Sequence, residues 1–250
     1  MKALITGASS GIGRDMARYL ASKKYELILV GRDKGKLEEL QETLPTKVTI
    51  IVADLANLQK VKELYVLTAK ENIDILINNA GFGDFGYFTE TDLNKELSMI
   101  DTNIKAVHVL TKSFLKDMEK RNSGYILNVA SSAAFQPGPL MATYYATKSY
   151  VYQLTEAINY EQKKKKTNVH ISVLCPGPVN TNFNNVAGVK FGVKPLSSPY
   201  VAKYAIDQML KEKMLIIPGF KMKCAKFFSR FLSDKFLLKI TYRIQKKKVN

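Results

Sequence analysis

The sequence has no tryptophan and only two cysteines and two histidines among its 250 residues, so it has few of the side chains that metal sites and disulfides need. Cys175 and Cys224 are too few for a disulfide framework and do not form a C-x-x-C motif. His108 and His170 lie in apolar segments, far from any cluster of cysteines or carboxylates. We therefore expect no metal site, no histidine-based triad and a reducing, cytoplasmic location.

Long apolar runs are also absent. No stretch approaches the roughly 20 uninterrupted apolar residues that a membrane span needs. The opening MKALITGASS passes from a few apolar residues straight to glycine, which is typical of neither a signal peptide nor a transit peptide. At 46% hydrophobic residues, the chain can bury one substantial core, and we expect one catalytic domain rather than two.

Acidic residues are scarce mainly at the C-terminal end. Residues 201–250 contain 13 basic and 3 acidic side chains, which accounts for most of the net charge of +16. No nucleic-acid-binding motif accompanies this charge, and basic charge alone is nonspecific. We therefore do not expect nucleic acid as a partner.

The chain contains a regular alternation of short apolar runs and helical patterns. The apolar runs are residues 3–6, 26–30, 48–52, 73–77, 125–129 and 169–174. Amphipathic stretches at 58–69, 92–120 and 200–211 have the spacing of helices. This order predicts an α/β fold with a single doubly wound parallel sheet of the Rossmann type.

A glycine-rich turn, Gly7-Ala-Ser-Ser-Gly11-Ile-Gly13, follows the first apolar run and precedes a helical pattern. Glycines allow a tight turn and a close approach of backbone N–H groups to a phosphate, whose negative charge the helix N-terminus favours. The order of strand, glycines and helix predicts a dinucleotide site.

The second apolar run ends in Gly31-Arg32-Asp33, where a dinucleotide fold contacts the adenosine ribose. An acid at this strand end selects the free 2′-hydroxyl, whereas an arginine selects the 2′-phosphate. Gly31 occupies the expected acidic position and Arg32 follows it, which favours NADP(H). NAD(H) is the less favoured alternative, because a strand end shifted by one residue would bring Asp33 to the ribose.

Candidate catalytic residues lie in residues 131–148. Tyr144 and Lys148 are i, i+4 neighbours on one helical face, and Ser131 precedes Tyr144 by thirteen residues. A nearby ammonium favours the phenolate, so we expect Lys148 to lower the pKa of Tyr144 from its ordinary value near 10. The Tyr-x-x-x-Lys pattern alone is not specific, because it recurs elsewhere in the chain. Its place after an apolar strand and downstream of the glycine turn gives it meaning.

Two further features lie around these residues. Asn103 falls inside the helical stretch 92–120, where asparagine is mildly unfavourable, so it is a candidate ligand for water or backbone. Residues 175–181, CPGPVNT, end the strand at 169–174 and place Val179 and Thr181 at the carboxyl edge of the sheet, where open α/β sheets bind ligands.

Six motifs together resemble the classical short-chain dehydrogenase/reductase family in order and spacing, over about residues 1–215. They are TGASSGIG (6–13), NNAG (78–81), the helix of Asn103, Ser131, YxxxK (144–148) and PGPVNT (176–181). The resemblance implies that Tyr144 is the general acid/base and that Lys148 lowers its pKa and holds the nicotinamide ribose. It implies that Ser131 polarises the carbonyl and that Asn103 anchors a water in the proton relay.

The same resemblance implies a set of cofactor-binding residues. They are Gly7, Ser9, Ser10, Gly11, Ile12, Gly13, Arg32, Asp54, Leu55, Asn79, Ala80, Gly81, Tyr144, Lys148, Pro176, Gly177, Val179 and Thr181.

Substrate identity depends on residues 182–199, which correspond to the variable substrate lid of this family. The apolar members of this segment are Phe183, Val186, Val189, Phe191 and Val193. They suit a lipophilic ketone or aldehyde, although the same residues would also pack the lid against the domain.

Residues 219–250 are expected to form a basic amphipathic helical extension to a catalytic domain at 1–218. Two helices are predicted, at 220–232 and 236–244, and cations flank the apolar residues of the second. This pattern is typical of a segment that lies in a membrane interface, here at the inner face of the membrane. Alternatively, its apolar face covers the catalytic domain or a second subunit.

Two functions from different classes fit the sequence. The first is an NADP(H)-dependent oxidoreductase that interconverts a carbonyl and a secondary alcohol, and the second is a dinucleotide-binding redox sensor or scaffold that acts through its basic tail. The complete set of Asn103, Ser131, Tyr144 and Lys148 favours the enzyme. The family resemblance also implies a homodimer or homotetramer formed through the helices of Asn103 and Tyr144.

Overall fold

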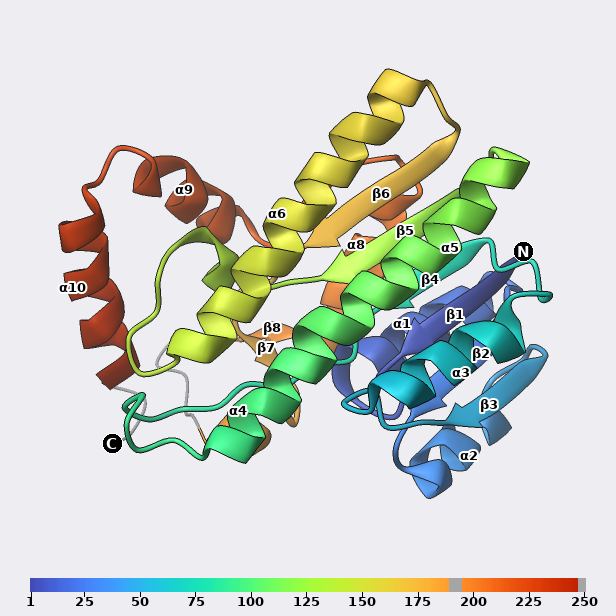
Figure 1. Ribbon diagram of the computed structural model, residues 1–250, viewed down its shortest axis with the longest axis horizontal. Coiled ribbons are helices and arrows are strands. Elements are labelled where there is room, and N and C mark those ends of the chain that lie inside the picture. The colour runs from blue at the N-terminus through green and yellow to red at the C-terminus, as the bar shows by residue number, and fades with distance from the viewer. Residues whose placement is uncertain (189–194, 247–250) are drawn as a thin grey trace.

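The computed structural model describes residues 1–188 and 195–246, and in these residues seven strands form one parallel sheet (Figure 1). Its order is β3-β2-β1-β4-β5-β6-β9. The strands are β1 (Lys2–Thr6), β2 (Glu26–Gly31), β3 (Val48–Val52), β4 (Ile75–Asn78), β5 (Gly124–Val129), β6 (Val169–Leu174) and β9 (Leu215–Ile216). The predicted single doubly wound parallel sheet is confirmed.

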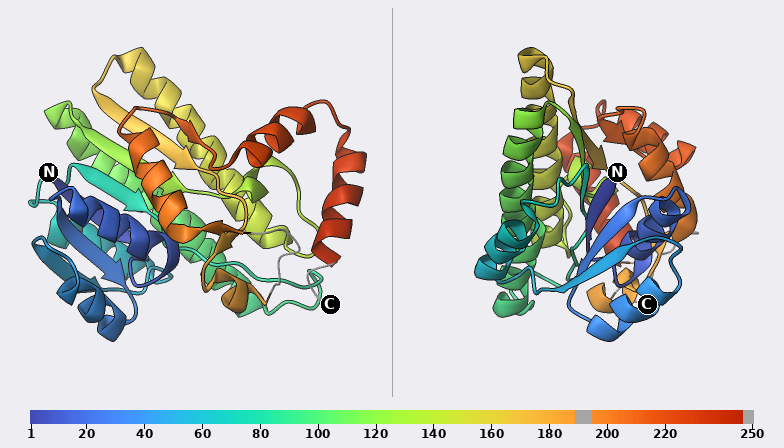
Figure 2. Two further views of the ribbon diagram at one scale, coloured as in Figure 1. Left: turned by 180° about the vertical axis from the view of Figure 1, so that it is seen from behind. Right: turned by 90° about the vertical axis from the view of Figure 1, so that its right-hand side faces the viewer.

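Helices cover both faces of the sheet (Figure 2). One layer contains α1 (Gly11–Ser22), α2 (Lys34–Glu42) and α8 (Ser198–Met209). The other contains α3 (Leu58–Thr68), α4 (Leu93–Ile100), α5 (Val107–Arg121) and α6 (Ala142–Lys165). The sheet is therefore buried on both sides, as apolar parallel strands require.

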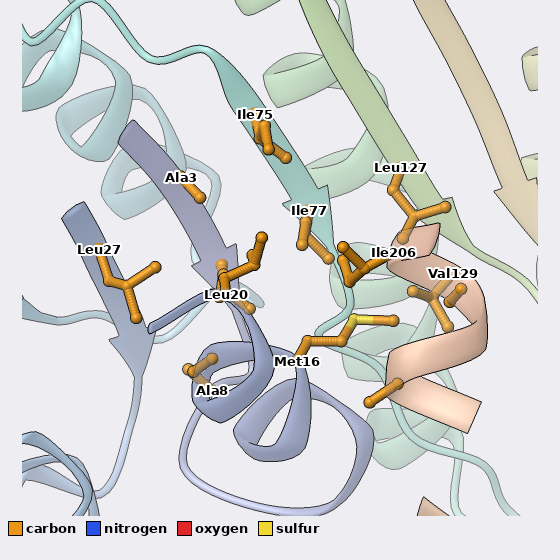
Figure 3. Packing of buried hydrophobic residues seen from close by; sticks show 14 of the residues in the cluster. Ala3, Ala8, Met16, Leu20, Leu27, Ile75, Ile77, Leu127, Val129 and Ile206 are labelled. Carbon is orange, nitrogen blue, oxygen red and sulfur yellow. The ribbon is translucent and has the colours of Figure 1, made fainter. Parts of the chain in front are cut away.

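Side chains of β1 show how the core divides between these layers. Ala3 and Ile5 pack with Met16 and Leu20 of α1, as Figure 3 shows for most of them, whereas Leu4 faces the opposite cluster under α3 and α5. Successive residues of a strand point to opposite faces, so one apolar strand supplies both cores.

Strand order reverses beside β1, which pairs with β2 on one side and with β4 on the other. The chain builds β2 and β3 outward from β1 in one direction and then returns to build β4, β5 and β6 in the other. The loops after β1 and β4 therefore diverge at the carboxyl edge of the sheet and leave a crevice, which is where doubly wound folds bind ligands.

The predicted long helix at 92–120 is continuous but not uniform. A π-helical segment, η1 (Asp101–Ala106), separates α4 from α5 and contains Asn103. Such segments leave no mark in the hydrophobic pattern, and they occur frequently at functional sites. The two-residue strand β9 was not predicted either, because so short a run gives no periodic signal.

The segment after β9 forms α9 (Phe220–Ser229) and α10 (Asp234–Lys246). In Figure 1, α9 leads away from the sheet and α10 turns back toward the end that carries α4 and α6. No helix of the described residues is both long and apolar enough to cross a bilayer. We call residues 219–246 the C-terminal arm.

Four polar side chains form a buried network between the central strands and their helices. Asn78 of β4 donates to Thr111 of α5 at 3.0 Å and to the Oδ1 of Asn128 of β5 at 2.8 Å. The Nδ2 of Asn128 in turn donates to Thr155 of α6 at 3.0 Å. Hydrogen bonds inside a core are worth little net energy but are costly to break on one side only.

Asn128→Ala should therefore lower the free energy of unfolding by about 2–4 kcal/mol, because it removes partners of Asn78 and Thr155 without removing those groups. Ser172→Ala on the neighbouring strand is the matched control. The Ser172 hydroxyl is buried and has no hydrogen-bond partner among the described residues. Its removal should change stability by less than about 0.5 kcal/mol or increase it. Urea unfolding measures both, and equal losses would contradict the network's role.

Candidate active site

One cavity of about 960 Å³ opens at the carboxyl edge of the sheet. Its walls come from the segments that follow β1, β2, β3, β4, β5 and β6, from the start of α6 and from the C-terminal arm. A volume of this size is at the upper end of the range for small-molecule sites and can hold a large ligand. Segments far apart in the sequence therefore meet around one space.

The structure brings most of the predicted site residues to this cavity. Those that line it are Gly7, Ser9, Ser10, Gly11, Ile12, Arg32, Asp54, Leu55, Asn79, Ala80, Gly81, Ser131, Tyr144, Lys148, Pro176, Gly177, Val179 and Thr181. Two predicted residues, Gly13 and Asn103, do not line it. Both lie directly behind the wall, for reasons that their contacts explain.

The glycine turn after β1 has the backbone that a phosphate cradle needs. Gly7 and Gly11 have φ values of +65° and +55°, in the region that favours glycine. Gly13 supports the turn from within, since a Cβ there would lie 2.4 Å from both Gly7 O and Asn79 Nδ2. Gly13 thus lies behind the wall of the cavity, where the absence of a side chain allows the turn to pack closely.

Asn79 fixes this turn to the end of β4. Its Nδ2 donates to Thr6 O at 3.0 Å and Gly7 O at 3.1 Å. In return, the Thr6 hydroxyl accepts hydrogen bonds from the backbone N–H groups of Asn79 and Ala80, each at 3.0 Å. These four bonds join segments that are about 70 residues apart and set the width of the crevice.

The residues that follow β2 bear on the choice between NADP(H) and NAD(H), which the sequence left open. β2 ends at Gly31, and the Asp33 carboxylate is the N-cap of α2, accepting from Lys36 N at 3.1 Å and pairing with Lys36 Nζ at 2.7 Å. Arg32 is exposed and lines the cavity, as does Lys36. Lys36 was missed from the sequence, although its position three residues after a capping aspartate places it at the helix start.

Ser131, Tyr144 and Lys148 converge on the cavity from the end of β5 and the start of α6. The Ser131 hydroxyl accepts from Ala133 N at 3.1 Å and lies close enough to the Tyr144 phenol to affect its pKa, as its neighbour Ser132 does not. Lys148 is 5% exposed, and its Nζ lies 5.9 Å from the centre of the Tyr144 ring and donates to Val129 O at 3.0 Å.

Burial dominates the electrostatics of this group. It raises the pKa of Tyr144 above its ordinary value, and the hydrogen bond from Ser131 opposes that shift. Burial lowers the pKa of Lys148 to about 8. The pKa of Tyr144 is therefore raised and not lowered as expected, because desolvation disfavours the charged forms of both side chains.

Asn103 is fully buried, and its side chain binds protein groups. Its Oδ1 accepts from Phe82 N at 3.1 Å, and its Nδ2 donates to Phe82 O at 2.9 Å and Thr147 at 3.0 Å. A Cβ at Gly81 would lie 2.8 Å from Asn103 Oδ1 and 3.2 Å from Lys148 Nζ. The asparagine thus lies next to the lysine, screened from the cavity by the loop after β4.

Sequence reasoning left the position of the C-terminal arm open, with packing against the catalytic domain as one alternative, and in the structure the arm contributes to the wall. The arm residues that line the cavity are Met222, Ala225, Lys226, Phe228, Ser229, Leu232, Leu237, Ile240 and Ile244. The sequence predicted a helical face of Phe236, Ile240 and Ile244; Ile240 and Ile244 line the cavity, whereas Phe236 does not and is 51% exposed. From the predicted lid, Phe183 and Val186 line the cavity, whereas Val189, Phe191 and Val193 lie outside the described residues.

Comparison with known proteins now identifies the family. A family model described as short chain dehydrogenase matches residues 1–189. The chain belongs to the short-chain dehydrogenase family. It is an oxidoreductase of the NAD(P)-dependent kind, as the resemblance implied.

Relatives of this family are similar over most of the chain. An uncharacterized oxidoreductase of Staphylococcus saprophyticus is 32% identical over 214 residues, covering 82% of this chain and 91% of the relative. An uncharacterized short-chain type dehydrogenase/reductase of Sinorhizobium fredii is 37% identical over 196 residues, 77% of this chain and 75% of that one.

Solved structures agree with the fold. A short-chain dehydrogenase from Sphingobium yanoikuyae in complex with NADPH has a TM-score of 0.82 at 27% identity, covering 88% of each chain. A short-chain dehydrogenase/reductase from Burkholderia phymatum in complex with NAD has a TM-score of 0.81 at 26% identity, covering 90% of this chain and 91% of that one. A bulky-bulky ketone specific alcohol dehydrogenase from Comamonas testosteroni has a TM-score of 0.79 at 26% identity, covering 92% and 91%.

The close packing under the glycine turn can be tested with two glycines. Gly13→Ala should lower the free energy of unfolding by about 1–3 kcal/mol or more, because its Cβ would meet a backbone oxygen that cannot move aside. Gly35→Ala is the control. The nearest atom to a Cβ there is Asp33 Oδ1 at 3.7 Å, so it should be neutral or stabilise by up to about 1 kcal/mol. A neutral Gly13→Ala in urea unfolding would contradict the assignment.

Proposed function

We propose that the protein is an NADP(H)-dependent carbonyl reductase that acts on a lipophilic ketone or aldehyde, with Tyr144 as general acid/base. One observation carries the proposal. A single cavity is lined by the glycine turn, by Ser131, Tyr144 and Lys148, and by the apolar inner face of the C-terminal arm. A dinucleotide and an apolar carbonyl compound can therefore meet beside the phenol of Tyr144.

The residues present fit a nicotinamide dinucleotide. Positive φ values at Gly7 and Gly11 expose backbone N–H groups at the start of α1, where an anion is favoured. Gly7, Ser9, Ser10, Gly11, Ile12, Asp54, Leu55, Asn79, Ala80, Gly81, Pro176, Gly177, Val179 and Thr181 would surround the bound dinucleotide, and Gly13 would support it from behind. When bound, the dinucleotide supplies or accepts the hydride at the carbonyl carbon.

Protein groups supply the proton and the orientation. The Ser131 hydroxyl would donate a hydrogen bond to the carbonyl oxygen, and Tyr144 would transfer its proton to that oxygen as charge develops there. The raised pKa of Tyr144 keeps the phenol protonated at neutral pH, which suits reduction. Lys148 is largely charged below pH 8, so its ammonium would hold the ribose and stabilise the phenolate that forms.

Asn103 would anchor a water of the proton relay. Its Nδ2 is fully used by Phe82 and Thr147, but Oδ1 accepts one hydrogen bond and has a second lone pair. This oxygen and Lys148 Nζ lie close to the same point beside Gly81. A water that bridges Asn103 Oδ1 and Lys148 Nζ would connect the Lys148 ammonium to the proton relay.

The end of β2 supports NADP(H) over NAD(H). β2 ends at Gly31, and Asp33 after it also lines the cavity, but both of its carboxylate oxygens already have a partner in Lys36, at the backbone N and at Nζ. Arg32 and Lys36 line the cavity there and would bind a 2′-phosphate. Similar structures bind NADPH in one case and NAD in another, so the preference depends on these residues.

We further propose a catalytic domain at 1–218 with an extension at 219–250, and a homodimer or homotetramer in the cytoplasm that pairs through α5 and α6. These helices lie side by side (Figure 1), joined by a 2.7 Å hydrogen bond between His108 and Tyr150. A monomer in analytical ultracentrifugation would contradict the pairing. The redox sensor or scaffold gains no support, because the arm contributes wall residues to the cavity of Tyr144.

Replacement of Tyr144 by Phe tests the reaction. It should lower kcat for NADPH-dependent ketone reduction by about 10²–10⁴, since the proton donor is lost, while leaving NADPH affinity within about threefold. Tyr160→Phe is the matched control, because Tyr160 also precedes a lysine by four residues on α6 but is 62% exposed. Retained turnover in Tyr144→Phe would refute the assigned role.

Replacement of Arg32 by Ala tests cofactor choice. Loss of a charge-assisted contact should raise KM for NADPH by about tenfold or more and change KM for NADH by less than about threefold. Lys34→Ala removes an exposed cation two residues away that does not line the cavity, and should change neither. Parallel losses with both cofactors in steady-state kinetics would argue against 2′-phosphate recognition.

The pH profile tests Lys148. Because burial lowers its pKa to about 8, the ammonium is present below that pH and is lost above it. kcat/KM for NADPH, which reports the free enzyme, should fall as the pH rises through about 8. Lys148→Met should be slow at every pH and lack this limb. A wild-type profile that stays level from neutral to strongly alkaline pH would contradict the assignment.

A further inference from the structure

Aromatic side chains are exposed where α9 meets α10. Phe227, Phe231 and Phe236 are 57%, 73% and 51% exposed, and the rings of Phe227 and Phe231 are in contact at 5.4 Å. None of the residues of α9 is fully buried. We call residues 227–236 the elbow. It lies at the periphery of the molecule in both Figure 1 and Figure 2. Clustered exposed aromatics of this kind mark an interaction surface.

Cations surround the elbow, and acids are nearly absent from it. The exposed basic residues of the arm are Lys221, Lys223, Arg230, Lys235, Lys239, Arg243 and Lys246. Asp234 is the single acidic residue of the arm in the part that the structure describes. Apolar rings between long cationic side chains match a surface that is negative outside and apolar just beneath.

The exposed surface of the arm continues into the active-site cavity. Phe228, Leu232 and Ile244 are 62%, 38% and 52% exposed, and all three also line the cavity. They therefore form its mouth on the side of the arm. Deeper in the same wall, Leu237 and Ile240 are more buried. Apolar side chains of the arm therefore line the cavity of Tyr144 and are also exposed on the outer surface.

We propose that the elbow docks on an anionic lipid bilayer and that the mouth beside it receives the lipophilic substrate from that bilayer. The second part rests on the proposed function, whereas the docking does not. Aromatic rings would enter the interface while lysine and arginine side chains reach the lipid phosphates. The apolar face of α10 was expected to lie in the membrane interface. In the structure Ile240 and Ile244 of that face line the cavity, so the docking is assigned to the elbow.

Charge argues against a second copy of the chain as the occupant of this surface. Two elbows facing each other would bring Arg230 and Lys235 of both copies together, with Asp234 as the one acidic side chain of each elbow. Like charges across an interface disfavour association, whereas an anionic bilayer complements each of these cations.

Co-sedimentation with vesicles tests the docking without any turnover. The full chain should bind vesicles of phosphatidylcholine with about 30% phosphatidylglycerol at least about tenfold more tightly than phosphatidylcholine alone. Phe227→Ser/Phe231→Ser should lose about tenfold or more of that affinity. The matched control is Val66→Ser/Leu67→Ser on α3, two residues that are 71% and 67% exposed, and it should bind like the wild type. Unfolding midpoints of all variants should agree.

Three results would overturn the proposal. The first is a wild-type chain that stays unbound at all lipid concentrations, and the second is equal binding by the elbow variant. The third is a dimer in sedimentation velocity that the elbow variant dissociates, which would assign the surface to a second copy. A separate measurement tests whether the substrate enters from the bilayer. Phe227→Ser/Phe231→Ser should reduce a vesicle-embedded long-chain ketone more slowly than the wild type and a short soluble ketone at the same rate. Equal rates with the embedded ketone would refute the route, even if the reductase assignment stands.

Discussion

The hydrogen bonds between Thr6 and Asn79 fix the geometry on which the site depends. They hold the ends of β1 and β4 together where the strand order reverses, so the glycine turn and the loop at Gly81 form two sides of one crevice. Gly81 in turn leaves room for Asn103 and Lys148 behind it. A parallel sheet gathers strand ends at one edge, but a specific crosslink decides how far apart they lie.

Much of this arrangement could be predicted from the sequence, because it depends on patterns with a short period. Alternating apolar runs predicted the six longer strands. Glycines in a strand-to-helix turn predicted the part of the cavity that would bind the dinucleotide phosphates. The π-helical turn around Asn103, the capping of α2 by Asp33 and the raised pKa of Tyr144 could not be predicted. Each follows from tertiary contacts or from the depth of burial, which local residue types do not encode.

The C-terminal arm shows the same limit on a larger scale. The sequence shows that the arm is basic and amphipathic. It does not show whether the apolar face contacts a bilayer, a partner or the rest of the chain, because an amphipathic helix can do any of these. In the structure, two side-chain hydrogen bonds hold α10 against residues before the arm: Thr241 accepts from Gln136, and Gln245 donates to Tyr145. The arm therefore has an inner face on the cavity and an outer face at the elbow, and the proposed substrate site and the proposed membrane contact lie on one segment.

The central claim is that the inner face of the arm forms the substrate part of the cavity next to Tyr144. Ile240→Trp tests it most directly, because the larger ring would fill that part of the cavity and leave the glycine turn untouched. We predict that kcat/KM for ketones of increasing chain length falls by about tenfold or more for the longest, with KM for NADPH unchanged within about twofold. An unchanged chain-length profile would contradict the claim, as would an equal loss for every ketone.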